Sequence, residues 1–154
     1  LIISYNRAMK KVRTLCLIVD SQKILLGQRE GKWGGFGGEV KENEEAVEGA
    51  KRKLWEELGI QAKTINLKGI IDFECPEESI EVHIFKVLDY SGSFIENKEI
   101  KLRWFDILEI PFGQMQSVDL YWLPLFLKDK KFKGKFIFKS RKELVSHDLE
   151  ILND

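Results

Sequence analysis

Residues 38–60, GEVKENEEAVEGAKRKLWEELGI, decide the fold of this chain because they predict a loop followed by one long helix. Asn43 can cap the start of the helix, and Gly59 suits the left-handed conformation that ends many helices. Between these ends, small or apolar residues recur at helical spacing: Val47, Ala50, Leu54 and Leu58. They form one apolar stripe that must face a core. The sequence therefore predicts a packed helix of about four turns.

The same helix predicts a cluster of charge away from the apolar stripe. Glu56 and Glu57 lie three and four residues after Lys53, so the lysine side chain reaches both carboxylates. Gly49 precedes Lys53 on this face and leaves room for a ligand to approach the backbone. Carboxylates that follow a glycine-rich loop suit Mg²⁺, which prefers oxygen ligands and often shares them with phosphates. The simpler alternative is a solvated helix face laced with ion pairs.

This stretch resembles the Nudix box, G-x5-E-x7-R-E-U-x-E-E-x-G-U with U apolar, at every fixed position except Lys53, where the box has glutamate. Because the glycines, the cap and Arg52 all match one long pattern, the solvated-face alternative is disfavoured. Flanking motifs resemble the MutT-homologue branch of the Nudix hydrolases, over roughly residues 12 to 145. These motifs are WGGFGG at 33–38, EVHIF at 81–85, WF at 104–105, YWLP at 121–124, KFKG at 131–134 and FIF at 136–138.

The remaining elements follow from turn residues and hydrophobic period. Strands are predicted at 12–19, 24–28, 65–73, 81–88, 100–105 and 135–138, and a second helix at 120–127. The pattern predicts a mixed β-sheet sandwiched between helices, as a single domain at residues 9–154, and the resemblance implies that this α+β arrangement is the Nudix fold. We expect residues 1–8 to be a non-native or alternative-start extension. His147 is expected to lie in a polar tail.

The resemblance implies a hydrolase that converts oxidised purine nucleoside triphosphates, such as 8-oxo-dGTP, to nucleoside monophosphate and pyrophosphate. It implies Mg²⁺ as cofactor, with Mn²⁺ as a substitute. The metal-binding residues that it implies are Gly37, through its carbonyl, Glu56, Glu57 and Glu99. The candidate catalytic residues are Arg52, Glu56 and Glu57, which match the box, and Lys53, which stands where the box has glutamate. The alternative is a nucleotide-binding module with weakened catalysis, because Lys53 replaces a metal-binding glutamate.

For the substrate, the resemblance implies a phosphate contact from Arg29. The residues that it implies for the base pocket are Thr14, Phe73, Asp119, Trp122 and Phe138. Aromatic rings can stack on a purine, and a carboxyl group can bond to its edge. Asp119 stands among apolar neighbours, where a buried carboxylate needs a partner that a purine supplies. Because Gly34, Gln116 and Val118 depart from the branch, oxidised guanine is one candidate among several nucleotides.

The composition bounds the other possibilities. The chain has 154 residues and 44% hydrophobic content, which fits one domain with a sizeable core. Its 25 basic and 25 acidic residues balance, so we expect a small anionic ligand and no nucleic-acid partner. The apolar runs are too short to span a bilayer, and no signal-peptide pattern occurs. Cys16 and Cys75 lack metal-ligand spacing. We expect a cytoplasmic monomer or weak dimer.

Overall fold

A computed structural model describes residues 10–95 and 97–152, and the extension predicted at residues 1–8 lies outside them. The elements follow the chain as β1 (Lys11–Asp20), β2 (Lys23–Arg29), β3 (Lys32–Gly34), α2 (Ala46–Leu58), β4 (Gln61–Glu74), β5 (Ser79–Ser91), β6 (Lys101–Asp106), the 3₁₀ turn η1 (Phe112–Gln114), α3 (Asp119–Leu127), β7 (Lys131–Ser140) and β8 (Glu143–Leu152). Within the described residues, no helix combines the length and apolar character needed to cross a membrane.

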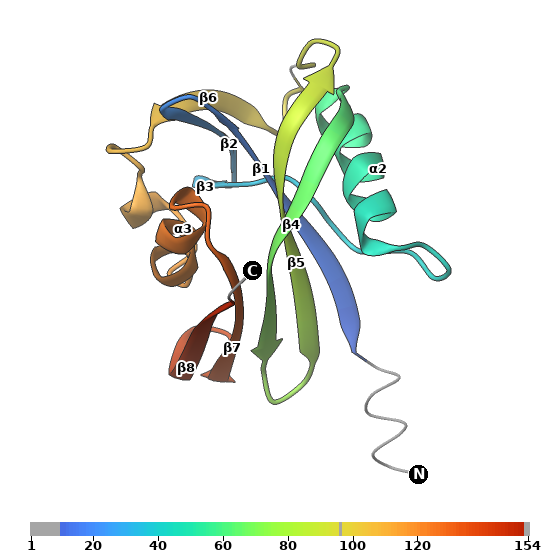
Figure 1. Cartoon of the computed structure of the whole chain (residues 1–154). Helices are drawn as coiled ribbons and strands as arrows, with labels where there is room; N and C mark the ends of the chain where they lie inside the picture. The colour runs from blue at the N-terminus through green and yellow to red at the C-terminus, as the bar shows by residue number, and fades with distance from the viewer. Residues whose placement is uncertain (1–9, 96, 153–154) are drawn as a thin grey trace.

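The strands of the described residues form one eight-stranded mixed sheet (Figure 1). Its hydrogen-bonded path runs β3-β2-β1-β5-β4-β7-β8, and β6 pairs with β2. The β1–β5 and β4–β7 pairs are parallel, whereas the β1–β2, β4–β5 and β7–β8 pairs are antiparallel. Parallel and antiparallel pairing in one sheet confirms the mixed sheet that the sequence predicts.

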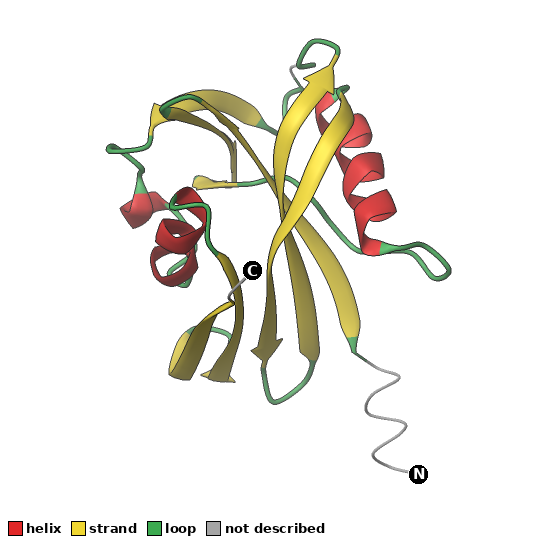
Figure 2. Cartoon of the chain, in the orientation of Figure 1, coloured by secondary structure: helices red, strands yellow, loops and turns green. Residues whose placement is uncertain are grey.

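Helices α2 and α3 lie on opposite sides of this sheet (Figure 2). Successive side chains of a strand point to opposite faces. In β1, Cys16 joins the core under α2, whereas Leu17 joins the core beside α3. In β5, Phe85 and Ile84 divide in the same way. The sheet therefore separates two hydrophobic cores, which confirms the predicted α+β sandwich.

The apolar stripe of α2 is confirmed, but the helix does not start where the sequence predicts. Ala50, Leu54 and Leu58 are fully buried in the core under α2. Asn43 instead adopts a left-handed turn with φ of 68°. The helix begins at Ala46, and the Glu48 carboxylate accepts a hydrogen bond from the backbone N–H of Glu45 at 3.3 Å, as in a capping box. The turn at Asn43 therefore makes the helix begin later in the chain than the sequence predicts.

The C-terminal hairpin corrects the prediction of a polar tail. β7 begins earlier than predicted, and β8 follows it as a ten-residue antiparallel strand at the end of the sheet. Phe136 of β7 lies opposite His147 of β8. Most β8 side chains are exposed, so the sequence carries little of the apolar alternation that identifies a strand buried on one face. The edge position explains why the strand was missed.

Candidate functional site

A glycine loop packs directly against β1 and brings its backbone under α2. The Cys16 N–H donates to the Phe36 carbonyl at 2.6 Å, and the Thr14 N–H donates to the Gly38 carbonyl at 2.9 Å. A Cβ atom added at Gly37 would lie 2.0 Å from the Thr14 carbonyl oxygen, so only glycine fits there. The two predicted loop residues Gly37 and Gly38 are therefore fixed beside the charged face of the helix.

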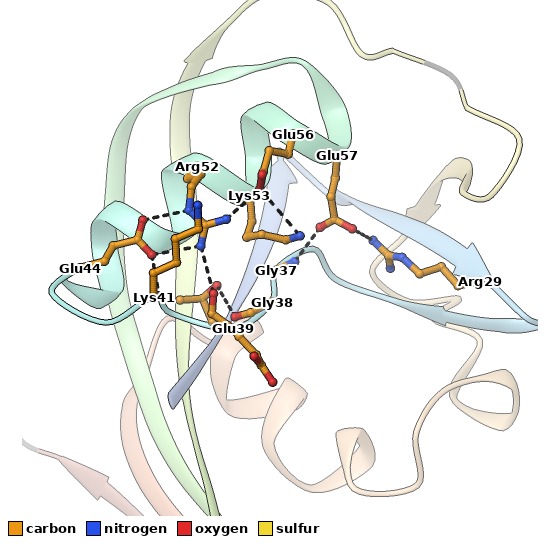
Figure 3. Close-up of polar contacts among 11 residues, drawn as sticks. Arg29, Gly37, Gly38, Glu39, Lys41, Glu44, Arg52, Lys53, Glu56 and Glu57 are labelled. Carbon is orange, nitrogen blue, oxygen red and sulfur yellow. Dashed lines mark hydrogen bonds and ion pairs between the residues drawn. The ribbon is translucent and has the colours of Figure 1, made fainter. Parts of the chain in front are cut away.

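Glu57 of α2 is held by two donors from outside the helix (Figure 3). The Gly37 N–H donates to Glu57 Oε1 at 3.0 Å, and the Arg29 guanidinium donates to Glu57 Oε2 at 2.8 Å. Arg29 also donates to the Gly35 carbonyl at 3.2 Å. Two donors on two oxygens fix the plane of the Glu57 carboxylate. Arg29, the predicted phosphate contact, is thereby tied to the proposed metal ligand.

Arg52 organises the other acidic residues of the helix. Its guanidinium donates to both Glu44 oxygens, at 2.9 and 3.0 Å, to Glu56 Oε1 at 2.8 Å and to the Glu39 carbonyl at 3.0 Å. The hydrogen bonds from Arg52 and from the Lys41 N–H lower the pKa of Glu44 to about 2. The pairing with Glu44 also raises the pKa of Arg52. Arg52 therefore holds the Glu44 and Glu56 carboxylates in place, and it does so with four hydrogen bonds to other groups of the protein.

Gly49 does not leave space for a ligand, in contrast to the prediction. A Cβ atom added there would lie 3.0 Å from Glu44 Oε1 and 3.4 Å from Val40 Cγ2. The missing side chain instead admits the Glu44 carboxylate to the helix face, where Arg52 binds it. The space that the sequence assigns to a ligand is therefore filled by a side chain of the Nudix-like stretch itself.

Lys53 reaches one of the two predicted carboxylates. Its Nζ lies 3.9 Å from Glu56 Oε1, whereas the described contacts of Glu57 are with Gly37 and Arg29. Figure 3 shows the Lys53 side chain extending from α2 toward the glycine loop. A Cβ atom added at Gly38 would lie 2.7 Å from Lys53 Cε. The prediction of a double ion pair was wrong because Arg29 takes Glu57.

The donor atoms of this cluster are of the type that a divalent cation prefers, but the carboxylates that lie together are few. Glu56 and Glu57 offer the hard carboxylate oxygens that such ions prefer. Glu99 is exposed ahead of β6, where the Asn97 side-chain oxygen accepts its N–H at 2.8 Å. In the described part of the chain, no three His, Cys, Asp or Glu side chains are grouped to hold one ion. The two helix carboxylates therefore remain the best-placed donors.

The second cluster lies beside α3 and centres on a buried carboxyl group. Asp119 is 8% exposed, and the Trp122 indole N–H donates to its Oδ1 at 3.1 Å. Burial raises the pKa of Asp119 to about 6, although the Trp122 hydrogen bond, a backbone hydrogen bond from Gln116 and the charge of Lys32 act in the opposite direction. This carboxyl group therefore exchanges its proton in mildly acidic solution, and either state can hydrogen-bond to a ligand.

Aromatic rings surround part of this second cluster. The ring centroids of Phe73 and Phe138 lie 6.4 Å apart, and Phe73 stacks on Phe136 at 5.5 Å. Both Phe73 and Phe138 pack against the core beside α3, which also contains Trp122. Thr14 is placed elsewhere, because its hydroxyl donates to the Gly38 carbonyl at 3.4 Å under α2. Four of the five predicted base-pocket residues thus share one side of the sheet.

Sequence reasoning missed two contributors to the second cluster. The charge of Lys32 in β3 acts on Asp119 across 87 residues of sequence. The His147 ring stacks on Phe136, with centroids 5.5 Å apart, and lies tilted against Tyr121 at 4.2 Å, rather than lying in a tail. Neither residue carries a local signal, because only the folded sheet brings it to α3.

Comparisons with known proteins place the chain in a family. A model of the NUDIX domain matches residues 9–126. The oxidized purine nucleoside triphosphate hydrolase of Danio rerio is 40% identical over 94% of this chain and 97% of that protein. The Mus musculus protein of the same name is 38% identical over 90% of this chain and 94% of that protein. The crystal structure of a mutator MutT protein from Bacillus halodurans matches 91% of this chain and 97% of that chain, with a TM-score of 0.82 and 30% identity.

Proposed function

Because the chain belongs to the Nudix family, we propose that it hydrolyses oxidised purine nucleoside triphosphates, such as 8-oxo-dGTP. The observation that carries the proposal is the similarity along almost the whole chain to two hydrolases named for that substrate. It favours a working hydrolase over a nucleotide-binding module that has lost turnover. The two clusters suit the two ends of such a substrate, with phosphates beside α2 and the base beside α3.

In the proposed reaction, one water hydrolyses the anhydride that joins the α- and β-phosphates through their bridging oxygen. The water oxygen bonds to the phosphorus that is attacked, the bridging oxygen leaves with the bonding electron pair, and the products are nucleoside monophosphate and pyrophosphate, with the water protons lost to solvent. Arg29 and the Gly37 N–H orient the Glu57 carboxylate, while Arg52 holds Glu56. Positioned groups of this kind stabilise the charge that develops on a leaving phosphate.

Nudix hydrolases use divalent metal ions, and we propose Mg²⁺ here, with Mn²⁺ as a substitute. Glu56 and Glu57 would hold it, with the Gly37 carbonyl and Glu99 as further ligands. The ion supplies charge neutralisation on the phosphates and a more acidic water. Lys53 lowers the affinity for the ion, since its ammonium lies near Glu56.

The base is proposed to bind between Phe73, Phe138 and Trp122, with Asp119 hydrogen-bonding to its edge. Stacking and a single carboxyl group favour purines, which offer a larger ring face and more edge donors and acceptors. A Cβ atom added at Gly34 would meet nothing within 4 Å, so the wall there is open. An open wall agrees with a pocket that accepts several oxidised or unmodified purines.

Product analysis tests the proposal. The protein is incubated with 8-oxo-dGTP, dGTP, dATP and dCTP in Mg²⁺, and the products are separated by ion-exchange chromatography. We expect nucleoside monophosphate and pyrophosphate in equal amounts, fastest from the purines. Inorganic phosphate as the first product would contradict the proposed bond cleavage, and equal rates on dCTP would contradict the base pocket.

We also propose that the protein acts in the cytoplasm as a monomer or weak dimer. The balanced charge of the chain gives no electrostatic attraction to nucleic acid or to an anionic membrane surface. Sedimentation velocity at several protein concentrations measures the assembly state. A stable species of three or more chains would contradict the proposal.

A further inference from the structure

The Lys53 ammonium lacks a close partner although it lies inside the charged cluster. The side chain is only 26% exposed, and its ion pair with Glu56 spans 3.9 Å, which is longer than a hydrogen bond. Within the described residues, Lys53 donates no hydrogen bond, whereas neighbouring Arg52 donates four. A lysine ammonium has three donors. All three are therefore available to a ligand.

The Lys53 side chain is held against the glycine loop rather than extended into solvent. A Cβ atom added at Gly38 would lie 2.7 Å from Lys53 Cε, 3.2 Å from Cδ and 3.4 Å from Nζ. The stem thus occupies the space that a side chain at residue 38 would fill. This contact keeps the ammonium beside the Gly37 and Gly38 backbone, at the end of the cluster where the substrate phosphates are proposed to bind.

The charges of the cluster balance only because residue 53 is lysine. Three cationic side chains, Arg29, Arg52 and Lys53, pair with three anionic ones, Glu44, Glu56 and Glu57. A glutamate at residue 53 would remove one positive charge and add one negative charge, so the net charge of the cluster would fall by two units. Such a cluster repels a polyphosphate until divalent cations bind. The balanced cluster of this chain removes that requirement.

We propose that the Lys53 ammonium binds the substrate phosphates directly, so that this chain holds a nucleoside triphosphate without a divalent cation. The inference rests on the proposed function for the identity of the ligand. Lysine acts as a compact point charge toward phosphate. Hydrolysis still requires the divalent cation, because an ammonium does not activate water. Binding and turnover therefore differ in their need for metal.

Isothermal titration calorimetry of the full chain with dGTP in excess EDTA tests the inference. Without divalent cations the nucleotide is not consumed, so the heat reports binding alone. The unmutated protein is expected to bind dGTP, and Lys53→Gln to bind about ten- to a hundredfold more weakly in EDTA, because a charge-assisted hydrogen bond is lost. Lys53→Arg, which keeps the charge, should retain most of the affinity.

Lys51→Gln is the matched control, since it removes the same charge from an exposed position of the same helix. It should leave the affinity in EDTA unchanged, and an equal loss in Lys51→Gln would overturn the inference by showing a general charge effect. Failure of the unmutated protein to bind in EDTA, with normal binding in Mg²⁺, would also overturn it. Absence of both binding and hydrolysis in Mg²⁺ would instead contradict the proposed function.

Discussion

The cluster under α2 and the cluster beside α3 hold their carboxyl groups in opposite ways. Under α2, hydrogen bonds from Arg52 and from the Lys41 N–H lower the pKa of Glu44 to about 2. Beside α3, burial raises the pKa of Asp119 to about 6. One carboxyl group is thus fixed as an anion among cations, and the other is poised between its two protonation states.

This difference follows from what surrounds each group. The α2 cluster is partly open to water and matches each carboxylate with a guanidinium, an ammonium or a backbone N–H, which favours the charged form. In the α3 cluster, Asp119 is buried, and the effect of burial exceeds that of its hydrogen bonds with the Trp122 indole and the Gln116 backbone. A phosphate chain needs cationic groups, and a divalent cation that offsets its charge needs carboxylates that stay ionised. A base edge instead needs a group that can accept or donate a hydrogen bond. Each cluster is suited to one end of the proposed substrate.

The largest expected effect is that of Lys53→Glu on the α2 cluster. Replacing the ammonium by a carboxylate supplies an oxygen ligand and removes a positive charge that repels Mg²⁺. The Mg²⁺ affinity and the turnover should therefore rise together. The gain in turnover should be about a hundredfold or more, since a metal-activated water contributes several kcal/mol. Pyrophosphate release is measured against Mg²⁺ concentration for both proteins.

Lys51→Glu is the control for this change, because it alters the charge of α2 by the same amount on an exposed side chain. Lys51→Glu should change neither the Mg²⁺ affinity nor the turnover by more than about twofold at moderate salt. If Lys53→Glu leaves turnover and metal dependence as they were, residue 53 lies outside the metal site. The purine preference should not change, since it belongs to the α3 cluster.

The next effect is the loss of purine preference in Asp119→Ala. Removing the carboxyl group deletes a charge-assisted hydrogen bond to the base edge, which should reduce the preference for purine over pyrimidine triphosphates by about ten- to a hundredfold. Mg²⁺ dependence should stay as in the unmutated protein. Affinities for dGTP and dCTP in EDTA measure the preference. Equal affinities already in the unmutated protein would remove Asp119 from the base pocket.

The raised pKa of Asp119 gives a third expected effect, on stability. Its folded-state value of about 6 exceeds the ordinary 3.8, so its contribution is fully present below about pH 3.8 and is lost as pH rises through 6. Asp119→Asn avoids the cost of a buried charge. Relative to the unmutated protein, it should be more stable at pH 8 than at pH 4 by about 2 kcal/mol.

Urea unfolding at the two pH values measures this difference. Asp89→Asn, which removes a carboxylate from an exposed position of β5, serves as the control. Glu44 acts with the opposite sign, because its pKa is lowered from 4.5 to about 2. Its contribution is present above about pH 4.5 and is lost as pH falls through 2. A pH-independent Asp119→Asn difference would contradict the buried, proton-exchanging carboxyl group.

The sequence predicts the elements and contacts that arise from local spacing. The stripe of Ala50, Leu54 and Leu58 fixes the helix face because only one side of a helix can be buried at once. Asp119 stands out because a carboxylate among apolar neighbours needs a partner. The chain order of these residues is enough to identify both features.

Other contacts depend on competition between distant residues. Helical spacing places Lys53 within reach of Glu57, yet Arg29, which is 28 residues before Glu57, takes that carboxylate. Likewise, β8 is identified by its pairing with β7 and not by its own pattern, because both of its faces are largely exposed. Such contacts require the folded sheet.

The smallest expected effect is that of Gly38→Ala, which tests how the Lys53 ammonium is positioned. The added Cβ would meet atoms of the flexible Lys53 side chain, the nearest being Cε at 2.7 Å, so the lysine should swing aside at little cost in stability. We expect the free energy of unfolding to fall by less than about 1 kcal/mol. The affinity for dGTP in EDTA should fall about two- to fivefold, because the displaced ammonium keeps its charge but loses its position.

Gly113→Ala, where a Cβ meets nothing within 4 Å, is the control and should change neither the stability nor the affinity for dGTP. In a Lys53→Gln background, Gly38→Ala should no longer weaken binding in EDTA. A further loss there would mean that residue 38 acts on the phosphates through the loop backbone and not through Lys53.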